Sequence, residues 1–505
     1  MNEREVRYFS WDFFSRLIIL SFSTLQVIRW PIFPQFMDTY YHIHTAWGFL
    51  QAGGYSGWDF WQYAPVGRIH IYPPVFHLIL ALLLKIGISP VILAKLFETI
   101  APVVFLIVLW RFIRKYFGSS LAFFVALVFS SSFSYYLFLI DHLPSTMALT
   151  FGILSLGELF ERRVLNSLLL LALCFYTHIG AAYYIALSFI IFGLLNNEYR
   201  KESFICALSA MALSLPVIFK QLSGLRYIST LGYKMPEINV FWIKIFDYIF
   251  ALSGIIFVFR NEKKFRIFFG LFLASFIFLV YPRRLFSGEG YLAVILLAAL
   301  FLYSVYNRLK SRNIAVLFLL LVSILVLFIS PSLVINNDLE EVKAKCRVDF
   351  FTSAFTGMLS AKGSSVWFPR EYLSAAALIK ENSGQKDIFY STLRFAGVAV
   401  AGISGRATAD ALFPEIGPLY PFDPFLNSKI IMFTRDDDAG LVSQLVSKYN
   451  LAKIGENKMF ILYKNTSCGA RALFRRASVP FWLIGFICLI AGVSFLAQNK
   501  LKKFI

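Results

Sequence analysis

An acid, several aromatic residues and two histidines follow directly after the first long apolar run of this chain, which covers approximately residues 13–30. A short helix predicted from residue 38 would place on one face four residues of this segment: Asp38, Tyr41, His42 and Thr45. The second histidine, His44, would point elsewhere. A carboxylate beside an imidazole under apolar side chains suits a general base that deprotonates a hydroxyl, or a metal ligand. The simpler alternative is that Asp38 caps the helix.

A second acid–histidine pair, Asp141-His142, stands between the third and fourth apolar runs. If both acids return to the same face of a membrane, they could hold a divalent cation such as Mg²⁺ or Mn²⁺, or divide the roles of base and orienting group. We therefore predict four catalytic residues, Asp38, His42, Asp141 and His142, with Asp38 and Asp141 as the ligands of any metal. The alternative for Asp141 is again a helix cap, ahead of Pro144.

Two adjacent arginines, Arg283 and Arg284, lie in the predicted outer loop Pro282–Gly290. Cations are disfavoured on that side of a membrane protein, so their presence suggests a specific anion. The planar guanidinium fork matches a lipid phosphate or pyrophosphate. Lys220 and Arg226, after the seventh apolar run, could assist. Anchoring to lipid headgroups is the alternative.

Three further segments contribute candidate residues. His70 and Tyr72 precede Pro73-Pro74, where consecutive prolines fix the backbone, so these two side chains could line a pocket. His178 interrupts two paired apolar runs and either lines the pocket or packs in the core. The segment Trp58–Tyr63 is typical of an interfacial aromatic belt, with a platform for stacking sugars as the alternative.

The composition indicates what must position these residues. The chain has 505 residues, of which 58% are hydrophobic, and its mean hydropathy is +0.68. A soluble protein cannot bury that much apolar surface, so we predict an all-α polytopic membrane protein. The net charge of +19 comes from short Lys/Arg clusters between apolar runs, which indicates membrane topology and not a nucleic-acid partner. The first run has basic residues before it and no small-residue cleavage site, so we expect a membrane anchor.

Twelve apolar runs are candidate spans: 13–30, 90–112, 119–138, 144–160, 165–178, 180–195, 203–220, 240–259, 266–281, 291–306, 314–331 and 479–497. A further apolar run at 74–88 has two possible interpretations, a membrane span or a helix at the outer membrane surface. If it spans, the basic clusters fall on the wrong sides; if it lies along the outer interface or re-enters, they all face the cytoplasm. We therefore predict a multi-pass plasma-membrane protein with both termini cytoplasmic and 74–88 as a juxtamembrane helix.

This topology divides the chain into three parts. Residues 1–332 would form the transmembrane domain, with a long first external loop at 31–88. Residues 333–477 are less apolar and predict a small extracytoplasmic α/β domain, and 478–505 hold the last span and a short tail. The elements expected in the external domain are helices at 371–382 and 438–449 and strands at 387–392, 429–434 and 458–463. Two cysteines of this region, Cys346 and Cys468, could form a disulfide.

In this order the motifs resemble the GT-C superfamily of membrane glycosyltransferases. The matching features are the acid after span 1 (Asp38), a juxtamembrane helix, Tyr72-Pro73-Pro74, the second acid (Asp141), the basic turn Trp110–Gly118 and the break at Thr177-His178. The resemblance implies a polyprenyl-phosphate-linked sugar as donor and a glycan, lipid or other acceptor. It also implies a catalytic or metal-linked role for the first acid and a phosphate-binding role for Arg283 and Arg284. The chain is also similar to archaeal membrane proteins labelled as related to 6-pyruvoyl-tetrahydropterin synthase, but no residues here indicate pterin chemistry.

The chain departs from the oligosaccharyltransferase branch, because it lacks that branch's Trp-Trp-Asp-Tyr-Gly motif. The nearest fragment is Val366-Trp367-Phe368, so transfer to a peptide is disfavoured. A multi-span transporter or lipid-glycan flippase would explain twelve spans equally well. Against it stand the absence of a visible internal repeat and the small number of ionisable residues within the runs. A structural assembly protein whose external domain binds a partner is a third, weaker alternative.

Overall fold

The computed structural model describes residues 11–34, 36–224, 227, 240–336, 345–360, 370–412 and 416–481. Its contacts divide the chain into two compact units, of which the first comprises Met1–Pro31, Phe97–Pro216 and Lys234–Gly363. The second comprises Ile32–Leu96, Val217–Tyr233 and Ser364–Ile505. The candidate Arg226 and most of the predicted last span lie outside the described residues.

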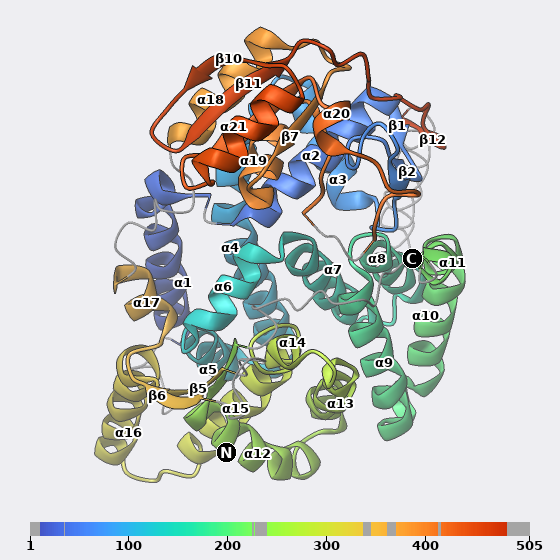
Figure 1. Ribbon diagram of the computed structural model, residues 1–505. Helices are drawn as coiled ribbons and strands as arrows, with labels where there is room; N and C mark the ends of the chain where they lie inside the picture. The colour runs from blue at the N-terminus through green and yellow to red at the C-terminus, as the bar shows by residue number, and fades with distance from the viewer. Residues whose placement is uncertain are drawn as a thin grey trace. The chain divides into compact units, whose positions relative to one another are not determined.

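The first unit is a bundle of helices with one small sheet (Figure 1). Its longer helices are α1 (Trp11–Ile28), α4 (Pro90–Phe117), α5 (Ser119–Phe129), α7 (Leu143–Phe160), α8 (Val164–Phe175), α9 (Ile179–Leu195), α10 (Arg200–Leu213), α11 (Leu215–Gly224), α12 (Ile245–Arg260), α15 (Tyr291–Tyr306) and α16 (Arg312–Ile324). Its shorter elements are α6 (Phe133–Asp141), α13 (Arg266–Ala274), α14 (Pro282–Phe286), α17 (Ala354–Ser360), β4 (Val240–Lys244), β5 (Ser332–Asn336) and β6 (Lys345–Asp349). Helices α4 and α11 continue into the second unit.

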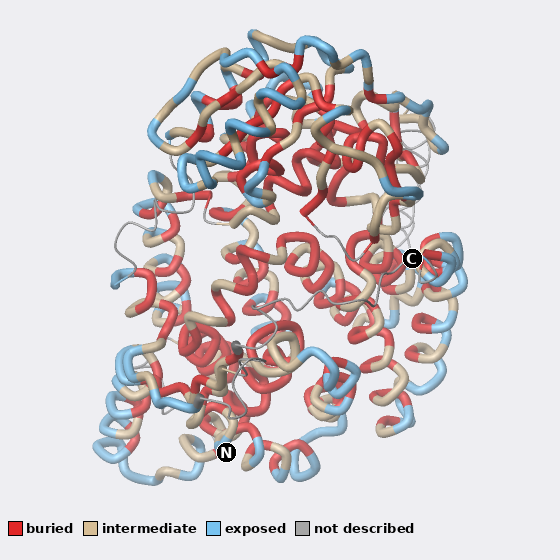
Figure 2. Tube along the Cα trace, in the orientation of Figure 1, coloured by how far each residue is buried: buried red, intermediate tan, exposed pale blue. Residues whose placement is uncertain are grey.

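Five described helices are long and apolar enough to cross a membrane: α1, α4, α7, the stretch Pro282–Tyr306 and the stretch Arg312–Ile329. The number rises to seven if two bent pairs, α5 with α6 and α10 with α11, each count as one span. The Pro282–Tyr306 window is 89% buried, whereas only 17% of the α16 window is buried, and Figure 2 shows exposed residues along α16. Exposed leucines on such a helix suit contact with lipid. The chain is thus a multi-pass membrane protein, and twelve spans remain a prediction.

Three expected spans differ from continuous helices. The run 119–138 is bent by 84° at Ser130–Ser132, where the Ser132 side chain accepts a hydrogen bond from the Tyr135 amide and so caps a new helix. The run 203–220 is bent by 59° just before Pro216, a residue that cannot donate to a preceding turn. The run 240–259 begins as strand β4, which pairs antiparallel with β5. Short apolar runs do not distinguish a strand from a helix, which explains the third difference.

The second unit holds α2 (Met37–Ala52), α3 (Val75–Lys85), α18 (Arg370–Asn382), α19 (Arg394–Ser404), α20 (Pro424–Asn427) and α21 (Ala439–Lys448). Its strands are β1 (Gly54–Tyr55), β2 (Trp58–Asp59), β3 (Arg68–Ile69), β7 (Ile388–Ser391), β8 (Ala407–Thr408), β9 (Ile430–Thr434), β10 (Leu451–Glu456), β11 (Phe460–Asn465) and β12 (Val479–Pro480).

Five of these strands form one sheet in the order β10-β11-β9-β7-β8, with β7 parallel to both β8 and β9. Alternate residues of β9 face opposite sides. Ile431 and Phe433 pack with Leu445 of α21, while Tyr372 of α18 contacts Phe460 on the other face. The helices and strands expected between residues 371 and 463 are therefore present. Their placement outside the membrane remains a prediction, and so do the domain boundaries.

Helix α2 of the second unit packs against both α3 and α19. Most of its residues are buried, on all sides of the helix. Helix α19 approaches it closely at Gly402, where an added Cβ would lie 2.9 Å from the Tyr40 carbonyl oxygen. The helix that carries Asp38 is thereby fixed by packing along its length. Cys346, in the first unit, and Cys468, in the second, are both free thiols.

Candidate functional site

Asp38 lies in the first turn of α2 and is half-buried. The N-cap residue of this helix is Phe36, and no side chain caps it. The simple alternative for Asp38, a helix cap, is therefore not what the structure has. A carboxylate in the first turn is still favoured by the positive end of the helix dipole, which stabilises its ionised form.

His42 is one turn further along α2 and forms a chain of hydrogen bonds with His77 of α3. The Nδ1 atom of His42 lies 2.9 Å from Nε2 of His77, whose Nδ1 atom lies 3.2 Å from the Pro73 carbonyl oxygen. Because a carbonyl only accepts, His77 must donate from Nδ1, and its Nε2 must accept the proton of His42. Both rings are neutral in this arrangement. Burial, with repulsion from His70, lowers the pKa of His42 to about 3.

Aromatic rings enclose this histidine pair. The centroid of the Tyr72 ring lies 5.3 Å from that of His42 and 5.2 Å from that of His77, and the Phe76 ring lies 5.3 Å from His42. Tyr72 is thus beside the histidine pair, and its role in lining a substrate pocket remains a prediction. His44, expected to point away, is also buried; its Nε2 donates to the Arg406 carbonyl oxygen at 2.8 Å. Helix α2 therefore has two buried histidine-bearing faces where the sequence indicated one.

His70 belongs to a second buried network, centred on Asp59. The Nδ1 atom of His70 lies 2.6 Å from one oxygen of Asp59, and Nε of Arg68 donates to the other at 3.0 Å. Arg68 also donates to Gln62 and to the Ile416 carbonyl. Burial works to raise the pKa of Asp59, but His70 and Arg68 outweigh it and hold that pKa below its ordinary value. Burial lowers the pKa of His70 despite Asp59.

In the same loop, Phe60 and Trp61 are almost wholly buried. The expected interfacial aromatic belt is therefore wrong for these two residues. Their rings pack in the core of the second unit, where Trp61 lies against Phe49 of α2 with ring centroids 5.7 Å apart.

In the first unit, Asp141 is the last residue of α6 and His142 is the N-cap residue of α7. Arg283 of α14 donates to Asp141 Oδ2 at 2.7 Å, and the His142 Nε2 atom lies 3.6 Å from the same oxygen. Asp141 is buried, and neither it nor His142 caps α7 with its side chain. The structure thus groups an acid, an imidazole and a guanidinium at the junction of α6, α7 and α14.

Arg284 pairs with a different acid, Glu289, which is fully buried. Oxygen Oε1 of Glu289 accepts from Arg284 at 3.0 Å and from the Ser145 hydroxyl at 2.8 Å, and lies 3.9 Å from Nδ1 of His178. The other oxygen, Oε2, has no hydrogen-bond partner in the described part of the chain. Gly180 leaves room for the guanidinium, since an added Cβ would lie 3.1 Å from Arg284 Nη1. His178 also accepts from the Ala181 amide and so caps α9.

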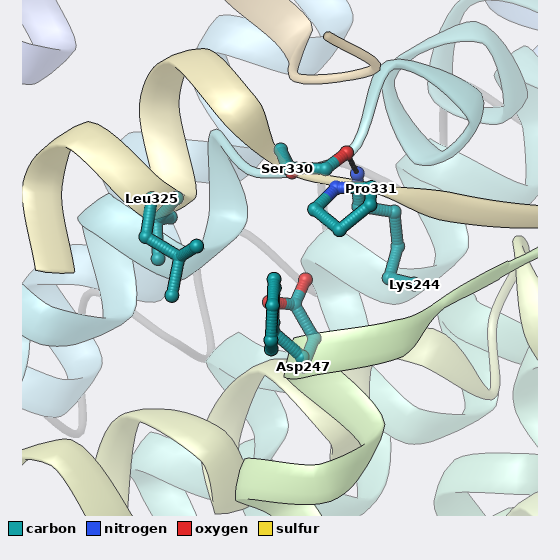
Figure 3. A pocket seen from close by; sticks show the side chains of 7 residues that line it. Lys244, Asp247, Leu325, Ser330 and Pro331 are labelled. Carbon is teal, nitrogen blue, oxygen red and sulfur yellow. Dashed lines mark hydrogen bonds between the residues drawn. The ribbon is translucent and has the colours of Figure 1, made fainter. Parts of the chain in front are cut away.

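A third polar group in the first unit surrounds Lys244 and Asp247 (Figure 3). The Lys244 Nζ atom donates to the Ser330 carbonyl at 2.6 Å and to the Thr352 hydroxyl at 2.8 Å. Asp247 accepts from the hydroxyls of Ser131 and Tyr291. Internal hydrogen bonds therefore satisfy both charged groups, and the residues that line this pocket come from β4, α12 and the stretch 325–331.

Three residues of these networks are not among the predicted site residues: His77, Arg68 and Glu289. All three are buried and bonded to predicted site residues or to a neighbouring acid. The signal for Glu289 was its position in Gly288-Glu289-Gly290, just after the two arginines. Lys220, a predicted phosphate ligand, lies in the second unit, where its Nζ donates to the Tyr55 hydroxyl.

No family model matches the chain, and no curated protein does so. Solved structures do match. The apo oligosaccharyltransferase of Archaeoglobus fulgidus aligns over 93% of this chain and 76% of its own, with a TM-score of 0.57 and 11% identity. The fold is that of the GT-C membrane glycosyltransferases. The arabinofuranosyltransferase AftD from Mycobacteria aligns over 89% of this chain but 41% of its own, with a TM-score of 0.53 and 13% identity.

Two further GT-C structures carry ligands. The Archaeoglobus oligosaccharyltransferase AglB, in complex with an inhibitory peptide and a dolichol-phosphate, matches with a TM-score of 0.54 and 11% identity, over 90% of this chain and 74% of its own. Another structure of the Archaeoglobus enzyme is a complex with Zn and sulfate. In the present chain, Asp141 and His142 offer an oxygen and a nitrogen 3.6 Å apart, a donor set that fits a divalent cation.

Proposed function

We propose that this protein is a membrane glycosyltransferase that moves a sugar from a polyprenyl-phosphate donor to a hydroxyl of a glycan, lipid or other acceptor on the extracytoplasmic face. The observation that carries the proposal is the GT-C fold over 93% of the chain. The acids at the start of α2 and the end of α6 support it, since neither caps a helix with its side chain. A fold shared with transferases does not by itself assign a reaction, so the residues must be tested.

In the proposed reaction the acceptor oxygen attacks the anomeric carbon from the face opposite the phosphate. The bond between the anomeric carbon and the phosphate oxygen breaks, and its electron pair leaves with the polyprenyl phosphate, so the configuration inverts. Asp38 takes the proton of the acceptor hydroxyl as its oxygen attacks. Tyr72, beside His42, would line the acceptor pocket with His70.

The remaining candidates would handle charge. Asp141 and His142 orient the acceptor or, together with Asp38, hold a divalent cation, which when bound would stabilise negative charge on the departing phosphate. Arg283 and Arg284 neutralise the donor phosphate. Because Arg283 is already paired with Asp141 and Arg284 with Glu289, each guanidinium must bind the phosphate and its acid together. Lys220 and Arg226 would help to bind the donor phosphate. His178, whose Nδ1 atom approaches Glu289, would line the substrate pocket.

The test compares membranes that contain the wild-type protein with membranes that contain Asp38→Asn. Each is incubated with labelled polyprenyl-phosphate sugars and a native lipid and glycan extract, and transfer of label is measured. Loss of a general base lowers the rate by about 10²–10⁴-fold. Asp12→Asn is the matched control, because Asp12 forms a partly exposed ion pair with Arg114 at the start of α1.

Transfer by the wild type and by Asp12→Asn, with loss in Asp38→Asn at equal expression, would establish the transferase and place Asp38 at its centre. Equal transfer by Asp38→Asn would remove this residue from the mechanism. If no donor supports transfer, the flippase alternative gains weight.

A further inference from the structure

Glu289 is held in the interior of the first unit by the glycines on either side of it. An added Cβ on Gly288 would lie 2.8 Å from the Arg284 Cα atom, and one on Gly290 would lie 2.6 Å from the Leu285 carbonyl oxygen. The backbone around Glu289 is thus pressed against α14. Because its side chain has no exposed surface, the carboxylate cannot turn to water when its partners change.

Arg284 compensates the charge of this buried carboxylate. Its Nη1 atom donates to Oε1 of Glu289 at 3.0 Å, whereas the second donor, Ser145, is a neutral hydroxyl. The Arg284 side chain is 28% exposed, so its other N–H groups can reach an anion that arrives from outside. One guanidinium then faces two anions. A buried charge that is not fully compensated is strongly unfavourable, so a second positive charge is needed beside Glu289.

His178 is placed to supply that charge. Its Nδ1 atom lies 3.9 Å from Oε1 of Glu289 and accepts from the Ala181 amide at 3.2 Å. Because the amide is the donor, Nδ1 carries no proton, and two acceptor atoms face each other. A proton on Nδ1 would convert this contact into a hydrogen bond between opposite charges. The two cations would meet at Gly180, where an added Cβ would lie 3.1 Å from Arg284 Nη1 and 3.3 Å from His178 Cε1.

Two features keep His178 neutral while Arg284 is paired with Glu289 alone. The Nδ1 atom caps the N-terminus of α9, where the helix dipole disfavours a cation. A proton on Nδ1 would also put a second positive charge near the guanidinium, with one carboxylate for both. An anion bound to Arg284 removes this second cost, because it adds the negative charge that balances the imidazolium.

The neighbouring ionisable groups do not compete for this role. The charge of Glu289 acts on the hydroxyls of Tyr135, on α6, and Tyr184, on α9. Tyrosine titrates near pH 10, so both hydroxyls stay neutral at physiological pH. The other arginine of α14, Arg283, is already paired with Asp141. The remaining groups on packed elements are His142, which approaches Asp141, and the Cys174 thiol, which donates to the Ala148 carbonyl.

We propose that His178 takes up one proton when Arg284 binds an anion, and that the imidazolium then shares the carboxylate of Glu289 with the guanidinium. The proton comes from solvent and binds Nδ1 of His178. The charges balance, since two cations then face two anions. This proton uptake rests on the proposed role of Arg284 as a ligand of the donor phosphate, and it adds regulation of that site by pH. Anion binding should strengthen as the pH falls, by up to about tenfold per pH unit.

The first test needs no ligand, because Arg284→Ala leaves Glu289 without its cation permanently. In this variant the folded state should bind a proton at His178 above about pH 6.5, where the histidine of the unfolded chain is mostly neutral. Stability then rises as the pH falls from about 8 to 6.5. The measurement is the Tm of the variant minus the wild-type Tm at each pH, so that histidines common to both proteins cancel.

The matched variant is Arg284→Ala/His178→Asn, in which asparagine can still cap α9 but does not titrate. The rise in Tm difference should be absent from it. Arg162→Ala, which breaks an exposed ion pair with Glu202, is the control and should follow the wild type at every pH.

The second test counts protons on binding. The probe is methyl farnesyl phosphate, a diester whose own charge does not change near neutral pH. It is titrated into the full-length protein in a neutral detergent by isothermal titration calorimetry, in buffers of different ionisation enthalpy. At about pH 7.5 we expect the wild type and Arg162→Ala to take up close to one proton per probe, and His178→Asn to take up almost none.

Probe binding without proton uptake in the wild type would overturn the proposal, and so would a Tm difference of Arg284→Ala that does not change with pH. A rise that persists in Arg284→Ala/His178→Asn would mean that Glu289 itself takes the proton, which removes His178 from this role. If Arg284→Ala does not fold, the proton count in the wild type and in His178→Asn decides.

The two proposals fail in different ways. If Arg284→Ala binds the probe as tightly as the wild type does, Arg284 is not its ligand, and both its donor role and the proton uptake are excluded. If the probe binds through Arg284 without a proton, only the coupling to His178 is wrong. Because no sugar is transferred in either test, failure of the transferase proposal would leave the measured proton uptake unchanged.

Discussion

Arg283 and Asp141 form an ion pair, in which the guanidinium Nη2 donates to the carboxylate Oδ2 at 2.7 Å. The residue expected to hold a lipid phosphate is thus bonded to the residue expected to act in catalysis. His142 approaches the same oxygen at 3.6 Å. A phosphate that draws Arg283 away would free this oxygen for a cation or an acceptor hydroxyl, which would couple donor binding to assembly of the site.

We predict that Arg283→Ala lowers kcat for sugar transfer by roughly 10–100-fold, because removal of a charge-assisted hydrogen bond costs about 1.5–3 kcal/mol. If Arg283 acts mainly on the donor phosphate, KM for the donor rises instead. Steady-state kinetics with varied donor separates the two effects. Arg283→Lys should recover part of the activity, and Arg162→Ala, which breaks an exposed ion pair with Glu202, should leave both constants unchanged. Wild-type kinetics in Arg283→Ala would exclude both roles.

The buried histidines of α2 predict that stability falls in mild acid. Burial lowers the pKa of His42 to about 3 and that of His44 to about 4, whereas unfolded histidine titrates near 6.5. Between about pH 6.5 and 4 the unfolded state therefore binds protons that the folded state does not. The stability contributed by neutral histidine is complete above about pH 6.5 and is lost as the pH falls, by up to about 1.4 kcal/mol per pH unit for each histidine.

The measurement is the apparent Tm of the purified protein at several pH values between 4.5 and 7.5, a window set by these pKa shifts. In His42→Gln one titrating group is gone while a side chain that can donate to His77 remains. Its Tm should depend less steeply on pH than that of the wild type. An unchanged dependence would mean that His42 titrates alike in the folded and unfolded states.

Much of the helical framework follows from the apolar runs, because a run long enough to cross a bilayer has few alternatives to helix. The segment that begins at Asp38 is helical as expected, and the strands near 388, 430 and 460 were predicted to within a few residues. These elements depend on local pattern and capping, which neighbouring residues determine.

The remaining features depend on contacts between residues far apart in sequence. Strand β4 is a strand because β5, about ninety residues later, pairs with it. His44 is buried because α19 covers the face of α2 that helical spacing left outside. Arg284 can pair with Glu289 because the chain forms the short helix α14, whereas the sequence predicted a loop there. Periodicity in one segment carries no information about such partners.

Asp59 should be essential for stability, because it is buried and neutralises Arg68 and His70. We predict that Asp59→Asn destabilises the protein by about 3–5 kcal/mol, since removal of one partner leaves a buried charge uncompensated. Thermal or denaturant unfolding measures the loss. Glu456→Gln, which breaks the exposed pair with Arg435, should change little. Equal stability of Asp59→Asn and Glu456→Gln would mean that the Asp59 network is less buried in solution than in this structure.

The acid–histidine pair of the first unit predicts that transfer depends on a divalent cation. Asp141 and His142 provide donors of the types that Mn²⁺ and Zn²⁺ accept, and Mg²⁺ would rely on the carboxylate. Chelation by EDTA should abolish label transfer, and added Mg²⁺ or Mn²⁺ should restore it. His142→Ala should raise the metal concentration needed for half-maximal activity by about 10–100-fold, as losses of metal-site partners do. The control is Asp12→Asn, which should need the same metal concentration as the wild type. Asp12 lies on α1 and is not one of the proposed metal ligands. Full transfer in EDTA would leave Asp141 and His142 with the role of orienting the acceptor, and Asp38 would then act as the base without a metal.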